Sequence, residues 1–263
     1  MKLDKGRIIG HVAAAALLAA VGYLVVPTMY MTLVSEGQAN SLLDVYLVNA
    51  VTLVFVFALP GLLLAHAFET VWQQFRRHCR RLSVETTGYC MLGAVGATLV
   101  ASLLVMLWQP YAEQLAGKLP ATPPLPQPQN AKEWILSLLS IAVAPAVCEE
   151  IFFRGFLQSV LSKWLPRAAL WLTAVVFAVL HFELLSFPGL LLIGWTLGTV
   201  LEKRGLIASM LFHAAYNGAV LLLSAQAGEI GLLGIFLCMA AYVFSIRALK
   251  REEKDHAFDG TGV

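Results

Sequence analysis

Residues 133–157 read EWILSLLSIAVAPAVCEEIFFRGFL, an apolar run interrupted in its second half by Glu149, Glu150 and Arg154. About 20 predominantly apolar residues cross the ~30 Å hydrocarbon core of a bilayer as a helix. Ionisable side chains at that depth cost at least about 2.5–3.5 kcal/mol each on insertion scales, so they normally serve function or pairing. The stretch therefore predicts a transmembrane helix and marks it as the first place to look for chemistry.

The whole chain of 263 residues has the composition of a membrane protein. Apolar residues make up 59% of it and charged residues 13%, and the mean hydropathy is +0.76. An ordinary soluble domain carries about 25% charged residues, so a soluble globule is excluded. The formal net charge of +2 gives no indication of nucleic-acid binding. We expect an all-α, polytopic integral membrane protein.

Hydropathy predicts about eight transmembrane helices. They lie near residues 8–34, 42–68, 86–108, 133–157, 167–184, 187–202, 205–226 and 229–248. The loops on one side then hold fifteen of the eighteen Lys and Arg residues, and those on the other side hold only Lys118 and Lys132. The positive-inside rule predicts that both termini lie in the cytoplasm.

This layout divides the chain into three predicted parts. Residues 1–132 contain three helices and a loop from Gln109 to Lys132 that is rich in proline and predicted to be extended on the non-cytoplasmic side. Residues 133–248 form the membrane core that holds the polar cluster, and residues 249–263 form a cytoplasmic tail.

The charged pattern within span four suggests different roles for its two carboxylates. Glu150 and Arg154 are four residues apart, in the favourable order for an ion pair within one helix. Glu149 lies about 100° around the helix and has no such partner, so desolvation favours its use as a general base. Pro145 removes a helix hydrogen bond and clashes with the carbonyl of Ile141, which predicts a kink beside the carboxylates.

Two further spans carry polar residues that can face this pair. Span five contains His181, which could bind water, a metal or the leaving group. Span seven contains His213 and Asn217, four residues apart and therefore on one face. The Asn217 amide can donate to a developing oxyanion. To bring His181 to the depth of Glu149, we expect either that span five begins later than residue 167 or that span four continues beyond Gly155.

The ordered motifs Glu149-Glu150-xxx-Arg154, Phe177-xxx-His181 and His213-xxx-Asn217 resemble those of the CAAX-protease and bacteriocin-processing (CPBP or Abi) family of intramembrane proteases. That family includes the type II CAAX prenyl endopeptidases. The resemblance covers residues 145–218 and implies a helical bundle around a cavity that opens to the cytoplasm. It also implies a multi-pass protein of a cell membrane, the bacterial inner or plasma membrane.

The resemblance assigns a role to each polar residue. It implies that Glu149 activates water with the help of His181, that His213 and Asn217 stabilise the oxyanion, and that Arg154 holds the pair formed with Glu150. A zinc site of Glu149, His181 and His213 is the alternative, because these are suitable ligand types. The helix motif of zinc proteases is absent, which favours the mechanism without a cofactor.

The sequence thus predicts an endopeptidase that cleaves a membrane-associated protein or peptide from the cytoplasmic side. Two other functions use the same residues. One is an ion-coupled transporter with a Glu and His relay, which the lack of paired broken helices disfavours. The other is a catalytically silent scaffold or immunity protein of the same fold. The sequence does not identify the substrate, a need for prenylation, the oligomeric state or the role of the first three helices.

Overall fold

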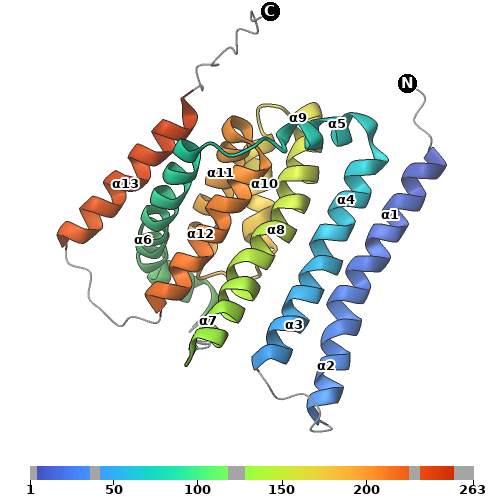
Figure 1. Ribbon diagram of the computed structural model, residues 1–263, viewed down its shortest axis with the longest axis horizontal. Helices are drawn as coiled ribbons and strands as arrows, with labels where there is room; N and C mark the ends of the chain where they lie inside the picture. The colour runs from blue at the N-terminus through green and yellow to red at the C-terminus, as the bar shows by residue number, and fades with distance from the viewer. Residues whose placement is uncertain (1–4, 36–41, 118–127, 225–231, 252–263) are drawn as a thin grey trace, which may run out of the picture.

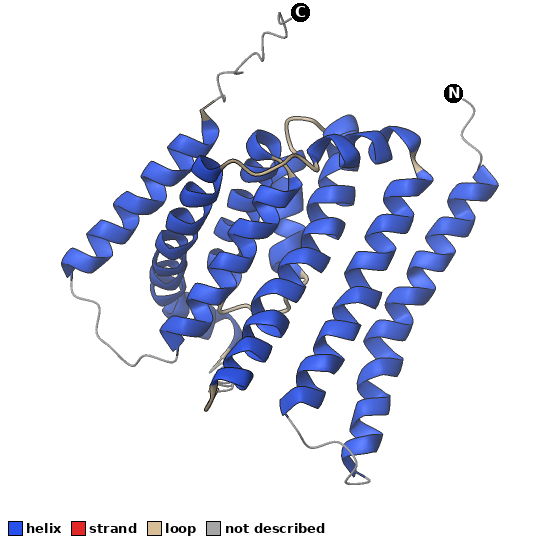
Figure 2. Cartoon of the chain, viewed as in Figure 1, coloured by secondary structure: helices blue, strands red, loops and turns tan. Residues whose placement is uncertain are grey.

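The computed structural model of the chain describes residues 5–35, 42–117, 128–224 and 232–251. These residues form helices joined by short turns, with no strand among them (Figure 2). The predicted all-α class is confirmed.

Several of the helices are continuous rods in which short π-helical segments, labelled η, separate α-helical ones (Figure 1). The elements are α1 (Lys5–Ala20), η1 (Val21–Val25), α2 (Val26–Ser35), α3 (Leu42–Leu53), η2 (Val54–Ala58), α4 (Leu59–Ala67), α5 (Glu69–His78), α6 (Val84–Ala116), α7 (Ala131–Ser137), η3 (Leu138–Val143), α8 (Ala144–Glu150), η4 (Ile151–Gln158), α9 (Ser159–Trp164), α10 (Ala169–Val179), α11 (Phe187–Arg204), α12 (Leu206–Ser224) and α13 (Leu232–Lys250).

A helix lies at each of the eight predicted positions, and the protein is a multi-pass membrane protein. Within the described residues, five helices are long and apolar enough to span a bilayer: Ile9–Leu33, Leu43–Ala67, Val84–Ala116, Ala131–Trp164 and Leu206–Ser224. Helix α1 begins and α13 ends at the same end of the bundle, as an even number of crossings requires (Figure 1). The count of eight and the cytoplasmic placement of that end stay predictions.

One boundary of the predicted non-cytoplasmic loop and one in span five were wrong. Helix α6 continues through Pro110 to Ala116, so the loop does not begin at Gln109. Most of the proline-rich stretch, residues 118–127, lies outside the described residues. Helix α10 ends at Val179, which leaves His181 in the turn that follows rather than within a span.

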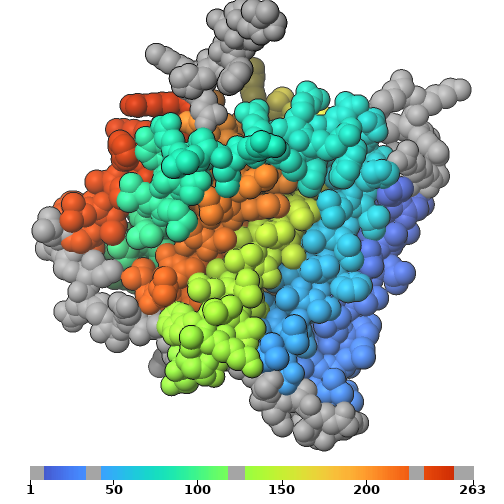
Figure 3. All heavy atoms as spheres, in the orientation of Figure 1, coloured from blue at the N-terminus to red at the C-terminus, as the bar shows by residue number. Residues whose placement is uncertain are grey.

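The sequence analysis missed the helix α5, which lies between the second and third spans. Its residues Val71 and Phe75 are buried, whereas Arg76 and Arg77 on the other face are exposed. This amphipathic pattern is typical of a helix that lies along an interface instead of crossing it. The segment from α5 to the start of α6, drawn in teal, covers one end of the bundle in Figure 3.

Prolines account for most of the π-helical segments. Three of the four in the described chain end two residues before a proline, at Pro27, Pro60 and Pro145. A π turn contains an extra residue, which gives room where a proline ring lacks an N–H and crowds the preceding turn. The disturbance predicted at Pro145 thus takes the form of η3. The fourth segment, η4, follows Glu150 directly and contains no proline.

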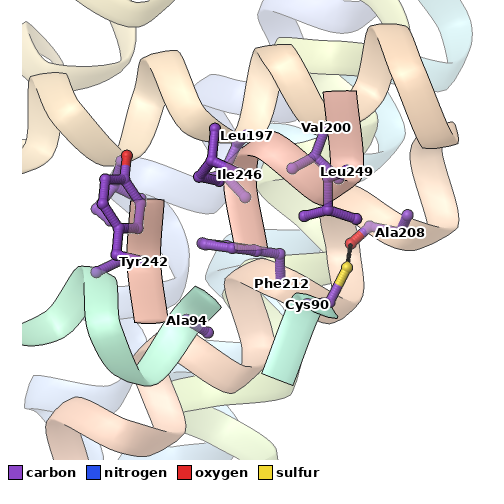
Figure 4. Close-up of a cluster of buried hydrophobic side chains, with 11 residues drawn as sticks. Cys90, Ala94, Leu197, Val200, Ala208, Phe212, Tyr242, Ile246 and Leu249 are labelled. Atoms are coloured by element: carbon purple, nitrogen blue, oxygen red, sulfur yellow. Dashed lines mark hydrogen bonds between the residues drawn. The ribbon is translucent and has the colours of Figure 1, made fainter. Parts of the chain in front are cut away.

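The apolar core lies among α6, α11, α12 and α13 (Figure 4). Phe212 is completely buried there, beside Leu197 and Ala94. The backbones approach closely at small residues: a Cβ built on Gly96 would lie 2.5 Å from the carbonyl oxygen of Cys238. Small residues at such crossings are typical of helix packing in membranes.

Candidate active site

The charged residues of span four lie where its rod passes against α12. Glu149 and Glu150 end α8, Arg154 lies in η4, and His213 lies on α12. All four are buried, with exposed fractions of 7%, 0%, 0% and 3%. The structure therefore brings together four of the six residues predicted from the sequence.

Glu150 is the centre of a dense network. Its Oε1 lies 2.9 Å from Nη1 of Arg154 and 3.1 Å from Nδ1 of His213, and its Oε2 accepts a hydrogen bond of 2.6 Å from the hydroxyl of Ser209. The predicted ion pair with Arg154 is present. Arg154 also donates from Nη2 to the carbonyl of Gly194, at 2.9 Å. A buried carboxylate with this many partners is held in one orientation.

Glu149 is equally enclosed but has a different environment. Its Oε2 has no hydrogen-bond partner among the described residues. Nε2 of His213 lies 4.0 Å from it. A buried polar atom without a partner is rare and costly, and it calls for an explanation such as a catalytic role. Two adjacent glutamates therefore differ sharply, one fully paired and the other open to a new partner.

Phe177 connects His181 to this network. Its ring centroid lies 4.6 Å from the ring of His181, 5.9 Å from that of His213 and 4.6 Å from Cζ of Arg154. Nδ1 of His181 lies 2.7 Å from the carbonyl oxygen of Phe177. Because a carbonyl only accepts, this nitrogen carries the proton and Nε2 is left as an acceptor. His181 is also close enough to Glu149 for electrostatic interaction.

Both expected changes in the helix ends are present, and together they bring His181 closer to the depth of Glu149 in the bilayer. The rod of span four continues past Gly155 to Trp164, and α10 begins at Ala169. Glu149 and His181 are then fifteen and twelve residues from these ends, a difference of roughly 5 Å at 1.5 Å per residue.

Asn217 has a partner that the sequence analysis did not anticipate. Its side-chain amide donates to the carbonyl oxygen of Ile141 at 3.3 Å. This is the carbonyl that Pro145, four residues later, cannot satisfy. The amide has a second N–H, so it can stabilise the break in span four and still donate to another group.

Sequence reasoning missed Ser209 and Gln158. Ser209 lies one turn before His213, so Ser209, His213 and Asn217 share one face of α12, and this spacing was the available signal. Gln158 lies one turn after Arg154 and donates to the carbonyl of Gly198 at 3.3 Å, as Arg154 does to that of Gly194. A Cβ on Gly198 would lie 2.8 Å from Oε1 of Gln158, so this glycine lets the Gln158 side chain reach the α11 backbone.

The arrangement does not support the zinc alternative. In the described part of the chain, no group of three or more His, Cys, Asp or Glu residues could hold a metal ion. Nδ1 of His213 lies against Glu150 and Nδ1 of His181 against the carbonyl of Phe177, which leaves Nε2 of each ring for another partner. As they are placed here, Glu149, His181 and His213 are not gathered into a metal site.

An apolar cavity of about 740 Å³ lies beside the site. It is formed mainly by the first two rods, and Phe152 of η4 and the residues on either side of His181, Leu180 and Phe182, complete its wall. Its polar lining residues are Tyr23 and Thr52. The volume falls within the range of about 300–1,000 Å³ that is usual for ligand sites.

Comparison with curated proteins and with solved structures gives no match. Comparison with protein families gives a match over residues 131–219, which include every residue of the three motifs. The matched family is described as type II CAAX prenyl endopeptidase Rce1-like, which indicates a membrane protease. The resemblance predicted from the motifs is confirmed: residues 131–219 match the model of the Rce1-like, CPBP-type family.

Proposed function

We propose that the protein is an intramembrane endopeptidase that uses a water molecule activated by Glu149. The observation that carries the proposal is the contrast between the two glutamates. Glu150 is paired with Arg154, Ser209 and His213, whereas Oε2 of the buried Glu149 has no hydrogen-bond partner in the described structure. A carboxylate without a fixed partner is suited to bind and deprotonate water.

The proposed reaction begins with water between Glu149 and His181. Glu149 accepts one proton from the water, and Nε2 of His181 accepts a hydrogen bond from it. The water oxygen attacks the carbonyl carbon of the peptide, and the electron pair of the C=O bond moves to its oxygen. Glu149 then passes the proton to the leaving nitrogen as the C–N bond breaks, which leaves a carboxylic acid and an amine.

His213 and Asn217 are the proposed donors to the oxyanion. Nδ1 of His213 lies 3.1 Å from Glu150, and its Nε2 lies 4.0 Å from Glu149. When Nε2 carries a proton as well as Nδ1, its N–H and the second N–H of Asn217 can stabilise the negative oxygen. Arg154 holds Glu150 in place through their ion pair.

The proposed substrate is a membrane-associated protein or peptide. The apolar cavity supports this, because its lining suits an apolar portion of a substrate next to His181. Access from the cytoplasmic side is supported by the exposed Arg76 and Arg77 at the end of the bundle covered by α5. The identity of the substrate is a question for experiment.

Substrate trapping tests the proposal. The Glu149→Gln variant and the unchanged protein are purified from native membranes, and co-purifying proteins are identified and offered to both forms. We expect proteins enriched on the variant to be cleaved by the unchanged protein only. A zinc chelator should leave the rate unchanged. The matched control is Glu113→Gln, because Glu113 is an exposed glutamate bonded only locally to Gln109.

Three outcomes contradict the proposal. Equal cleavage by the Glu149→Gln form excludes Glu149 as the base. Ion flux in proteoliposomes that needs Glu149, without cleavage, favours the transporter. Partner binding that survives replacement of Glu149, His181 and His213 together, again without cleavage, favours the scaffold.

A further inference from the structure

Ser209 is a completely buried polar residue with no assigned role. Its exposed fraction is 0%, and its hydroxyl lies 2.6 Å from Oε2 of Glu150 and 3.0 Å from the carbonyl oxygen of Leu197. A buried hydroxyl at these distances is committed to its neighbours and does not serve solvation.

Counting protons shows where this hydroxyl donates. It has one proton, and both neighbours are acceptors if Glu150 is ionised. The Arg154 guanidinium lies 2.9 Å from the other oxygen of Glu150, and this ion pair favours the carboxylate form. The shorter distance belongs to Glu150, as expected for a hydrogen bond to a charged oxygen. Ser209 therefore donates to Oε2.

We infer that Ser209 is a positioning residue that fixes the His213 ring through Glu150. With Oε2 held by Ser209, the carboxylate presents Oε1 to Arg154 and His213 together. His213 must then carry a proton on Nδ1, and its Nε2 points toward Glu149. The logic matches that of a buried acid that sets the tautomer and orientation of a catalytic histidine.

Two of the residues that act on the Glu150 carboxylate, Ser209 and His213, come from α12. Ser209 and His213 are four residues apart, so both contact the two oxygens of one carboxylate from a single helix face. Rotation of the Glu150 carboxylate would break both contacts at once. Without the Ser209 hydroxyl the Glu150 carboxylate can rotate, although its ion pair with Arg154 remains.

Nuclear magnetic resonance of ¹⁵N-histidine-labelled protein tests this directly. Ring nitrogen shifts distinguish the two neutral tautomers and the doubly protonated ring, and replacement of each histidine in turn assigns the signals. We expect Nδ1 of His213 to carry a proton in the unchanged protein, in the neutral ring as well as in the doubly protonated one. In Ser209→Ala, a substantial part of the neutral population should move to the form protonated on Nε2. Ser209→Thr, which keeps the hydroxyl, should restore the original signal.

Ser245→Ala is the matched control. Ser245 is also completely buried, but its hydroxyl has no hydrogen-bond partner among the described residues. Its replacement should leave the His213 signals unchanged. Identical His213 signals in Ser209→Ala, Ser245→Ala and unchanged protein would overturn the inference. Glu150→Gln gives an independent check, because it should disturb the same signals even where Ser209→Thr folds poorly.

A kinetic arm rests on the proposed function. With a substrate obtained by trapping, Ser209→Ala should lower kcat by about ten- to a hundredfold with little change in KM, since small displacements of catalytic groups have effects of this size. Equal reductions in Ser209→Ala and Ser245→Ala would contradict a positioning role. Failure to find any cleavage contradicts the proposed function alone, because the tautomer measurement needs no substrate.

Discussion

The two N-terminal rods and the helices that hold the site differ in how much of their surface is covered. In the most apolar stretches of Ile9–Leu33 and Leu43–Ala67, 11% and 17% of the residues are buried, against 44% in both Ala131–Trp164 and Leu206–Ser224. The rods form one edge of the bundle in Figure 1. The two regions therefore have different roles. The well-covered helices bury the charged residues and supply their partners, and the less covered N-terminal rods form most of the apolar cavity.

Polar contacts between these regions are few and specific. Tyr46 and Ser137 share a hydrogen bond of 2.5 Å, and Asn49 donates to the carbonyl of Ser140 at 3.0 Å. Both contacts lie on the part of span four before Pro145. On the other side of this proline, Glu149, Glu150 and Arg154 contact the core. The polar side chains of this rod thus point to the edge before Pro145 and to the core after it.

Removal of Arg154 is expected to give the largest loss of stability. Arg154→Ala leaves Glu150 as a buried charge without its main partner, which costs about 3–5 kcal/mol in comparable cases. Thermal and denaturant unfolding in detergent measure it. The control Arg167→Ala changes an exposed arginine and should have little effect. Addition of Glu150→Gln to Arg154→Ala should recover part of the loss, and no recovery would mean that Arg154 acts mainly through packing.

Gly96→Ala tests the closeness of packing in the core. The new Cβ would lie 2.5 Å from the carbonyl oxygen of Cys238, so α13 must move away from α6. We expect a loss of about 1–3 kcal/mol, as for other overpacked sites. Gly88→Ala on the same helix meets nothing within 4 Å and should be neutral or slightly stabilising. Equal effects at the two glycines would show that the α6–α13 contact is not tight.

Gly22→Ala makes the same test at the open edge. Its Cβ would lie 2.7 Å from Cβ of Phe55, yet the two rods can separate into the surrounding lipid. We therefore expect a loss below about 1 kcal/mol, smaller than at Gly96. Gly10→Ala, with nothing within 4 Å, is the control. A cost at Gly22 as large as at Gly96 would remove the proposed difference between edge and core.

His78, at the end of the helix α5 that joins the two regions, should give the smallest effect. Burial, followed by the positive charges of Arg80 and Arg77, lowers the pKa of His78 below its ordinary value of 6.5. The unfolded chain therefore binds a proton more readily than the folded protein. The stability contribution is present above pH 6.5 and is lost as the pH falls toward the lower folded value.

The test compares thermal unfolding of unchanged protein and His78→Gln at about pH 7.5 and about pH 5.5. The unchanged protein should lose more stability on acidification than the variant, by less than about 1 kcal/mol. Parallel losses in both would assign the pH dependence to other groups.

The sequence was sufficient to predict features that depend on composition and helical spacing. The all-α class, the positions of the eight helices and the Glu150–Arg154 pair follow from apolar run length and the i, i+4 rule. The prediction that Glu149 and His213 lie together followed from the cost of placing ionisable side chains in the membrane, because such residues normally serve pairing or function. All of these are properties of single helices or of the bilayer.

The features that were missed depend on contacts between helices. Nothing local to Ser209 distinguishes it from a serine that bonds its own backbone, and only the approach of α8 gives it a carboxylate partner. The pairing of Asn217 with Ile141 likewise needs two spans to be placed together. Helix α5 was missed because its ten residues are mostly charged or polar and fall below the hydropathy threshold for a span, although their amphipathic spacing was visible.

The π segment η3 sets the angular phase between the two halves of span four. Before it, Ser137 and Ser140 face the N-terminal edge, and after it Glu149 and Glu150 face α12. Deletion of one residue within Leu138–Val143 would remove the extra residue of the π turn and leave Glu149 and Glu150 in their present directions. Closing η3 to an α-helix with all its residues kept would instead turn one half against the other by about 100°, the angle between neighbouring residues, and would exchange the directions of the two glutamates. An alignment of this helix with its relatives must therefore allow a single-residue gap here, or it will equate the paired carboxylate of one protein with the unpaired carboxylate of another.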